Sequence, residues 1–234
     1  YKRQITYNEY GISVIDKEKC IRCGKCIHSC PFGAIASKTF IVPVIEALKA
    51  GKHIYAMAAP ATEGQFGVDI TMASWKKAMK EMGFTDFYDV GLGGDMTAAY
   101  EAEEWAEAYK EGNKKVTSCC PAFVNMVRLH YPELAECVST TVSPMCAVSR
   151  LIKAKDPEAI TVFIGPCVAK KSEVADQKIE GNADYVLTYS EIRAMMKAKG
   201  VELQPCANDD QTASTFGKRF ANSGGVTAAV LELS

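Results

Sequence analysis

The chain has 234 residues, and its 27 lysines and arginines against 28 aspartates and glutamates give a formal net charge of −1. Hydrophobic residues make up 48% and charged residues 24%, which is typical of a folded globular protein and excludes long disorder. No apolar run reaches the roughly eighteen residues of a membrane helix, and no basic stretch marks a nucleic-acid or membrane surface, so we expect no nucleic-acid and no membrane partner.

Residues 12–36 form a compact cysteine-rich unit. Its spacing, C-x2-C-x2-C-x3-C-P, is that of bacterial ferredoxins, where closely spaced cysteines bind the corners of an iron–sulfur cube. Zinc sites usually have two ligand pairs with a long spacer, and this run has none. We therefore favour a 4Fe–4S cluster over zinc. The four candidate ligands are Cys20, Cys23, Cys26 and Cys30.

The fourth cysteine of such a run ligates the other cluster in a ferredoxin with two clusters. Cys30 would then belong to a second cube, whose remaining ligands would lie upstream of Tyr1, because no later cysteine has the matching spacing. Alternatively, Cys30 closes the same cube, or a later cysteine does. The first residue is not Met and residues 225–234 read as a helix without a cap, so we expect a chain truncated at both ends.

From about residue 53 the pattern changes to short apolar runs that alternate with helical stretches, which predicts an α/β fold with parallel sheets and flanking helices. The expected strands are residues 53–58, 87–90, 115–117, 160–164 and 185–187. Core-facing helical stripes are expected over residues 72–82, 98–109 and 189–199, the last opened by a capping box at Thr188 and Glu191. We divide the chain into a partial ferredoxin-like domain, residues 1–36, and an α/β domain, residues 37–234.

Two of the expected strand ends carry cysteines beside a proline. Residues 115–123 predict a strand, a turn with Cys119 and Cys120, and a helix that opens with proline. Residues 163–173 predict the same order, with Cys167 at the helix start. Because ligands of open α/β sheets bind beyond the carboxyl ends of the strands, Cys120 and Cys167 could face one site. Two buried structural cysteines are an equally good interpretation of the spacing alone.

These segments resemble a known family. TSCCP at residues 117–121 and GPCVAKKSE at residues 165–173 are similar to the first two active-site motifs of iron-only (FeFe) hydrogenases, and the ferredoxin run resembles their accessory cluster domain. The resemblance implies a two-lobed hydrogenase-type domain in which Cys120 and Cys167 are two of four ligands of a 4Fe–4S cube. In the family this cube joins a di-iron unit that carries CO, cyanide and an azadithiolate bridge, and together they form the H-cluster.

The resemblance also implies a function and its limits in this chain. The function is the reversible reduction of protons to dihydrogen, with electrons from a ferredoxin-type carrier. The third family motif, which brings the other two cube ligands, does not occur before Ser234. We therefore expect the di-iron H-cluster only in a full-length parent, and this fragment alone to be inactive. The lack of a signal-peptide pattern and the clustered thiols place the protein in the cytoplasm.

A proton relay is implied by the same resemblance. Alignment outward from the first motif places its members at Cys119, Glu101, Ser139 and Glu104. Relay groups must lie within hydrogen-bond reach or one water apart. Glu101 flanks the apolar stripe of its helix, and Glu104 lies near the polar face, where a solvent mouth would be. Without the resemblance, a solvated helix face would be the ordinary interpretation of both glutamates.

Around the di-iron unit the resemblance places Lys170, Pro166, Ala59, Pro60, Ala61 and Phe220. Lys170 resembles the family lysine that donates to a cyanide ligand; otherwise it would be interpreted as a surface lysine in a Lys-Lys pair. Gly165 stands where standard enzymes carry Met, and further departures occur at Ala61, Met145 and Ala221. These departures favour a hydrogen-sensing relative with slow turnover, whereas the retained Cys119 favours turnover. A third possibility is a hydrogenase-like iron–sulfur assembly or electron-transfer protein without the di-iron unit.

Overall fold

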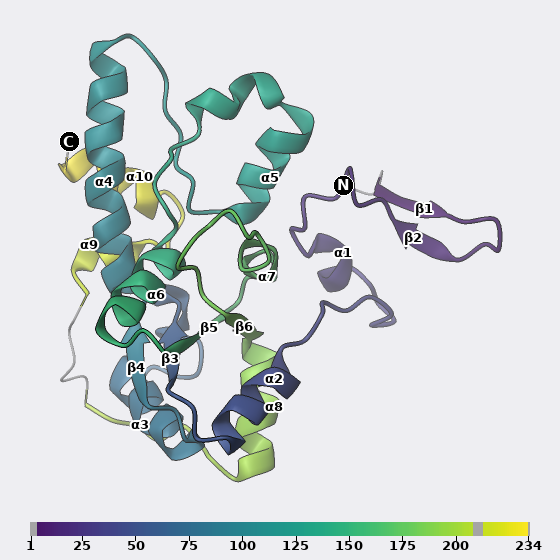
Figure 1. Ribbon diagram of the computed structural model, residues 1–234, viewed down its shortest axis with the longest axis vertical. Helices are drawn as coiled ribbons and strands as arrows, with labels where there is room; N and C mark the ends of the chain where they lie inside the picture. The colour runs from purple at the N-terminus through teal and green to yellow at the C-terminus, as the bar shows by residue number, and fades with distance from the viewer. Residues whose placement is uncertain (1–3, 208–212, 234) are drawn as a thin grey trace.

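The computed structural model describes residues 4–207 and 213–233, and its centre is a four-stranded parallel sheet (Figure 1). The strands β3 (Ile54–Ala58), β4 (Asp86–Asp89), β5 (Ile160–Gly165) and β6 (Tyr185–Thr188) lie in the order β4-β3-β5-β6. Their carboxyl ends share one edge, because Ala58 pairs with both Asp89 and Ile164, and Gly165 pairs with Thr188. The predicted α/β fold is confirmed.

One of the five expected strands is wrong. Residues 115–117 make only an isolated parallel bridge between Val116 and Val138. Val116 is 41% exposed, so this short run buries too little apolar surface to extend a sheet. The other four strands begin and end within one residue of their predicted bounds. The Cys119–Cys120 corner therefore follows a bridge between two loop segments and not a strand of the central sheet.

Helices cover both faces of the sheet. On one face, α2 (Ile41–Lys49), α3 (Met72–Met82) and α8 (Tyr189–Lys199) enclose a core around the fully buried Trp75. On the other face, α6 (Pro144–Lys155) packs Met145, Val148 and Ile152 against β3 and β5. The predicted capping box of α8 is present, with Thr188 and Glu191 each accepting the other's backbone N–H.

The long helix α4 (Gly91–Lys110) packs against α6, α9 (Thr215–Arg219) and α10 (Gly225–Leu233). Its first turn is built for close contact, since a Cβ on Gly93 would lie 2.2 Å from the Pro144 carbonyl oxygen. Ala98 and Ala102 are buried as expected, but Tyr109 at the far end is 71% exposed. The last turns of α4 extend past the sheet, which leaves this part of the predicted stripe without a core to face (Figure 1).

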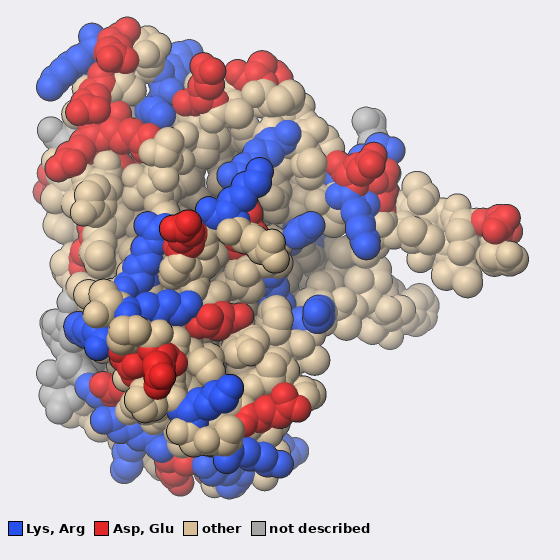
Figure 2. Space-filling view, in the orientation of Figure 1, with Lys and Arg blue, Asp and Glu red and all other residues tan. Residues whose placement is uncertain are grey.

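The amino-terminal segment lies beside the α/β body, and its hairpin extends away from it (Figure 1). It contains the antiparallel hairpin of β1 (Ile5–Tyr7) and β2 (Ser13–Ile15) and the short helix α1 (Lys25–His28). Figure 2 shows this hairpin projecting with a largely uncharged surface, while acidic and basic side chains intermingle over the body. Among the described helices, none combines the length and hydropathy that crossing a bilayer requires. The domain boundary at residues 36 and 37 remains a prediction.

Candidate functional site

The two cysteine corners lie together. Helix α5 (Pro121–His130) begins directly after Cys120, with proline in its first turn as predicted. The second corner differs from the prediction, because α7 (Lys170–Glu173) begins three residues after Cys167, which lies in the loop beyond β5. The Lys170 Nζ donates to the Cys119 carbonyl oxygen at 3.2 Å. This hydrogen bond connects the two corners directly.

Lys170 is buried, with 8% of its surface exposed, so the interpretation as a surface lysine is wrong. Its ammonium lies 2.7 Å from Glu173 Oε2, and Glu173 Oε1 accepts from the Ser143 hydroxyl. Asn182 Nδ2 donates to the Glu173 carbonyl at 2.9 Å. Buried charges persist in proteins when they are paired and hydrogen-bonded, as these are. Sequence reasoning missed Ser143, whose local signal is its position as N-cap of α6.

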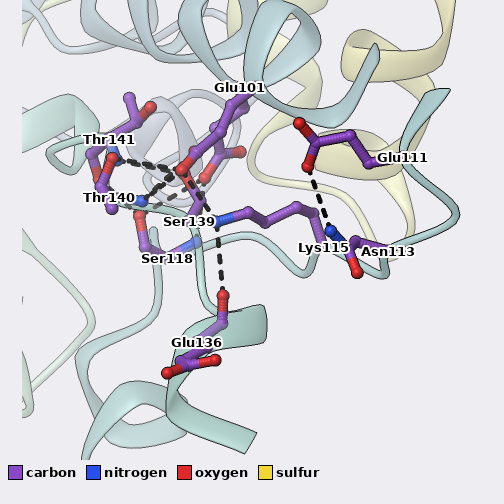
Figure 3. Close-up of polar contacts among 10 residues, drawn as sticks. Glu101, Glu111, Asn113, Lys115, Ser118, Glu136, Ser139, Thr140 and Thr141 are labelled. Carbon is purple, nitrogen blue, oxygen red and sulfur yellow. Dashed lines mark hydrogen bonds and ion pairs between the residues drawn. The ribbon is translucent and has the colours of Figure 1, made fainter. Parts of the chain in front are cut away.

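Glu101 and Ser139, two of the expected relay residues, come together between α4 and the loops that follow the Val116–Val138 bridge (Figure 3). Glu101 is 3% exposed, and its Oε1 accepts from the Ser118 backbone N–H at 2.9 Å. Within the described residues its Oε2 has no hydrogen-bond partner. Burial raises the pKa of Glu101, and the hydrogen bond from the Ser118 N–H opposes this only in part. This carboxyl group is suited to hold a proton.

Glu104 lies one turn further along α4 and is more polar in its surroundings. The Ser139 hydroxyl donates to Glu104 Oε2 at 2.5 Å, and the Thr140 backbone N–H donates to Oε1 at 3.0 Å. Lys115 Nζ lies 3.1 Å from Oε1. Burial alone would raise the pKa of Glu104, but the hydrogen bonds from Ser139, Thr140 and Lys115 outweigh it and lower the pKa. Glu104 is therefore ionised more readily than Glu101.

Cys119 completes the set. Burial raises the pKa of its thiol, and the nearby charge of Glu101 raises it further. The four predicted relay residues thus lie in one region. The Ser139 hydroxyl donates to Glu104, and Ser139 is close enough to Glu101 to lower the pKa of that carboxyl. Sequence reasoning missed Ser118, Thr140 and Lys115, because their roles depend on a loop contact between segments about twenty residues apart.

A cavity of about 420 Å³ adjoins both polar networks. Ser118 and Ser139 from the relay region line it, as do Ser143 and Glu173 from the Lys170 network. The remaining wall comes mainly from α5 and from the loop of residues 140–142. A water-accessible space of this kind could carry protons between groups that do not touch.

The loops at the carboxyl ends of β3 and β5 contain Ala59, Pro60, Ala61 and Pro166, four of the residues that the resemblance places around the di-iron unit. Ala59 N donates to the Ile164 carbonyl at 2.8 Å, which fixes η2 (Pro60–Thr62) beside the end of β5. A Cβ on Gly165 would lie 3.0 Å from the Ala59 Cβ and 2.8 Å from the Phe163 ring. The position therefore has no room for a side chain in this packing.

The two outer members of that set lie differently. Pro166 is exposed, in the loop just before Cys167. Phe220 follows α9 and packs against α4, where its ring lies 3.2 Å from the place that a Cβ on Gly94 would occupy. The structure thus brings Ala59, Gly165 and Lys170 to one edge of the sheet and sets Phe220 beside the helix that carries Glu101.

The ferredoxin-like loop turns sharply around Cys23, because Arg22 and Gly24 on either side have φ values of 61° and 75°. The Cys30 Sγ accepts from the Ala34 N–H at 3.3 Å, and backbone N–H groups of Ala34 and Phe32 lower the pKa of this thiol. Such a thiol suits metal ligation. In residues 4–207 and 213–233, no three cysteine, histidine or acidic side chains are arranged as ligands of one ion, and the four cysteine ligands remain a prediction from the spacing along the loop.

Three comparisons with known proteins bear on this site. Residues 52–234 match the family model described as iron only hydrogenase large subunit, C-terminal domain, and residues 13–36 match a 4Fe-4S binding domain. Iron hydrogenase 1 of Clostridium pasteurianum is 30% identical over 288 residues, which cover 93% of this chain and 50% of that protein. The cytosolic Fe-S cluster assembly factor NAR1 of Kluyveromyces lactis is 34% identical over 79 residues, 34% of this chain and 17% of that protein.

Among solved structures, the FeFe-hydrogenase HydA(deltaEFG), from work on stepwise H-cluster assembly, superimposes with a TM-score of 0.66. The identity is 25%, and the match covers 81% of this chain and 56% of that one. The chain spans about half the length of the curated hydrogenases it matches.

Proposed function

The chain belongs to the iron-only hydrogenase large-subunit family and carries a 4Fe–4S binding motif, and from this premise we propose that it forms part of a site for the reversible reduction of protons to dihydrogen. Electrons would arrive from a ferredoxin-type carrier through the cluster on Cys20, Cys23 and Cys26. The observation that carries the proposal is the hydrogen bond from Lys170 to the Cys119 carbonyl, since it joins the two motif corners.

The cysteines of these corners have the chemistry that the H-cluster requires. Cys120 and Cys167 supply thiolates of the kind that bind iron–sulfur cubes. When bound, the di-iron unit of the H-cluster supplies the chemistry by which two protons and two electrons combine to dihydrogen. The buried Lys170 would donate to an anionic ligand from this edge of the sheet, and Ala59, Pro60, Pro166 and Phe220 would line its surroundings.

The relay region would deliver protons. Glu104 is partly exposed and ionised, so it can take up a proton from solvent. The Ser139 hydroxyl contacts Glu104 and lies close to Glu101, so it can pass the proton inward. The raised pKa of Glu101 keeps the proton on that carboxyl, beside the Cys119 thiol. Cys119 would then make the last transfer.

The test uses the full natural protein that contains this chain, matured with its metal clusters. Infrared bands of iron-bound CO and cyanide, together with dihydrogen release from reduced ferredoxin, are the expected result. The Cys120→Ser variant should lose both signals, whereas Cys206→Ser, at an exposed cysteine outside the motifs, should keep them. A matured protein whose iron content corresponds to 4Fe–4S clusters alone, without these infrared bands, would overturn the proposal.

A hydrogen-sensing role is a second candidate, favoured by the packing at Gly165. Phe163 and Ala59 fill the space of a side chain at this position, so the pocket differs in shape and polarity from one that carries Met. A turnover rate like that of standard hydrogenases would exclude the sensing role.

The match to NAR1 keeps a cluster-assembly role open, and infrared bands of iron-bound CO and cyanide would exclude that role. We also propose a cytoplasmic location, because the cysteines cluster in the manner of metal ligands and not of a disulfide framework.

A further inference from the structure

The ferredoxin-like loop rests directly on the second cysteine corner. A Cβ placed on Gly24 would lie 2.2 Å from Val168 Cγ2, so the Gly24 backbone touches this side chain. Gly24 lies one residue after Cys23, and Val168 lies one residue after Cys167. The contact therefore joins the immediate neighbours of one ligand from each of the two cluster sites.

Two hydrogen bonds from α5 support the same contact. Asn125 Nδ2 donates to the Ile21 carbonyl at 3.4 Å, and His130 Nε2 lies 3.1 Å from the Lys19 carbonyl. Since α5 begins directly after Cys120, the loop is held against the helix of the first corner as well as against the second. The corners of Cys120 and Cys167, which would hold one cube, thus both contact the ferredoxin-like loop, which would hold the other cube.

The chain leaving this loop is also fixed. Lys171 is 9% exposed, and its ammonium donates to Ser37 Oγ at 3.0 Å and to the Lys38 carbonyl at 2.9 Å. The same ammonium pairs with Glu191 on α8 at 2.8 Å. A buried cation that neighbours Lys170 therefore ties the connection between the two parts of the chain to α8.

We infer that the Gly24–Val168 contact sets the separation between the ferredoxin-like cluster and the cube on Cys120 and Cys167, with Lys171 as a positioning residue for the loop. The inference rests on the proposed function, because it concerns electron delivery to that cube. Electron transfer between two centres slows steeply with distance, so a side chain at position 24 would slow it by forcing the loop outward. Glycine at this position is required by the contact and by its φ of 75°.

The test separates these two requirements. Gly24→Ala adds a methyl group that collides with Val168. Gly33→Ala is the matched control, because Gly33 has a φ of 60° in the same segment but nothing within 4 Å of an added Cβ. The double variant Gly24→Ala/Val168→Ala removes the colliding Cγ2, and the nearest remaining atom is then the Val168 Cβ at 3.6 Å, an ordinary contact.

In the full natural protein with its clusters, the readouts are the magnetic coupling between the two reduced cubes in electron paramagnetic resonance and the rate of electron transfer between them. Gly24→Ala should weaken the coupling and slow the transfer severalfold, because the added methyl group pushes the loop away from Val168. Gly33→Ala and the double variant should remain close to the parent.

The inference fails when Gly24→Ala matches Gly33→Ala, or when Val168→Ala does not restore the coupling. Val168→Phe is a second probe for the case in which Gly24→Ala does not load its cluster, because it pushes the loop outward and leaves the loop sequence unchanged. Coupling that responds as expected without dihydrogen turnover would overturn the proposed function and keep this inference. Dihydrogen turnover with a coupling that does not respond to the variants would overturn this inference and leave the proposed function standing.

Discussion

Lys170 donates to the Cys119 carbonyl across 3.2 Å while its ammonium is paired with Glu173 inside the protein. One buried cation therefore does two things at once: it neutralises an internal carboxylate and holds the backbone between the two motif cysteines. This relationship explains why the second motif places a lysine three residues after Cys167 and a glutamate three residues after that lysine. The first prediction tests it.

Replacement of Lys170 by methionine should destabilise the fold by roughly 3–5 kcal/mol, because it leaves Glu173 charged and buried without its cation. Chemical denaturation of the chain at neutral pH measures this. Lys178→Met, at an exposed lysine in the following segment, should stay within about 0.5 kcal/mol of the parent. Equal stability of the two variants would contradict the structural role of Lys170.

Glu101→Gln should abolish proton delivery while it stabilises the fold. The raised pKa means that the native state favours the protonated carboxyl. The contribution of Glu101 to the free energy of unfolding is therefore fully present below the unfolded pKa of about 4.3 and is lost as the pH rises through the folded pKa. Glutamine cannot ionise, so the variant should be the more stable protein at neutral pH, and the difference should shrink toward pH 4. Unfolding curves over this pH range measure it.

The same variant in the matured full protein should lose on the order of 100-fold or more in dihydrogen turnover, the usual size of general acid–base contributions. Its clusters should remain, as counted by iron content. Glu103→Gln is the matched control, since Glu103 lies on the same helix with an exposed side chain. Similar turnover in the two variants would remove Glu101 from the relay.

Glu104→Gln should respond to pH in the opposite sense. The lowered pKa of Glu104 stabilises the native state above the unfolded pKa of about 4.3, and this stabilisation is lost as the pH falls through the folded value. The variant should therefore be less stable than the parent at neutral pH by about 1–2 kcal/mol, because the hydrogen bonds to a charged acceptor are lost. A difference that grows on acidification would contradict the assignment.

Gly165→Ala should destabilise the fold by about 1–3 kcal/mol, because the added methyl group would lie 2.8 Å from the Phe163 ring. Phe163→Leu in the same chain should recover part of this loss, and the interaction energy follows from a double-mutant cycle of denaturation measurements. Additive effects of the two changes would mean that the ring does not limit the space at position 165.

The amino-terminal cluster can be tested on the chain by itself. After anaerobic reconstitution, the chain should bind a 4Fe–4S cube at the ferredoxin-like loop, and Cys23→Ser should remove most of that iron. Cys206→Ser should retain it, because this exposed cysteine belongs to neither cluster motif. Iron analysis and visible absorption measure both. Unchanged iron in Cys23→Ser would exclude Cys23 as a ligand.

Local patterns determined much of this protein. Several predictive patterns depend only on residues that are close together in the chain. They are the cysteine spacing between Cys20 and Cys30, the capping box at Thr188 and Glu191, and the alternation of apolar runs with helical stretches. Hydrogen-bonded turns and burial of one helix face depend on such short-range order. These patterns were sufficient to predict the parallel sheet and the helices α3 and α8 that cover one of its faces, but not α2 or α6.

Only the tertiary structure decided what lies between distant segments. It reduced the expected strand at residues 115–117 to a bridge with Val138, buried Lys170 beside Glu173, and placed Gly24 against Val168. The physical reason is that burial and charge pairing are properties of a three-dimensional neighbourhood. A lysine in a Lys-Lys pair reads as solvated until the fold brings a carboxylate and a carbonyl oxygen to its ammonium.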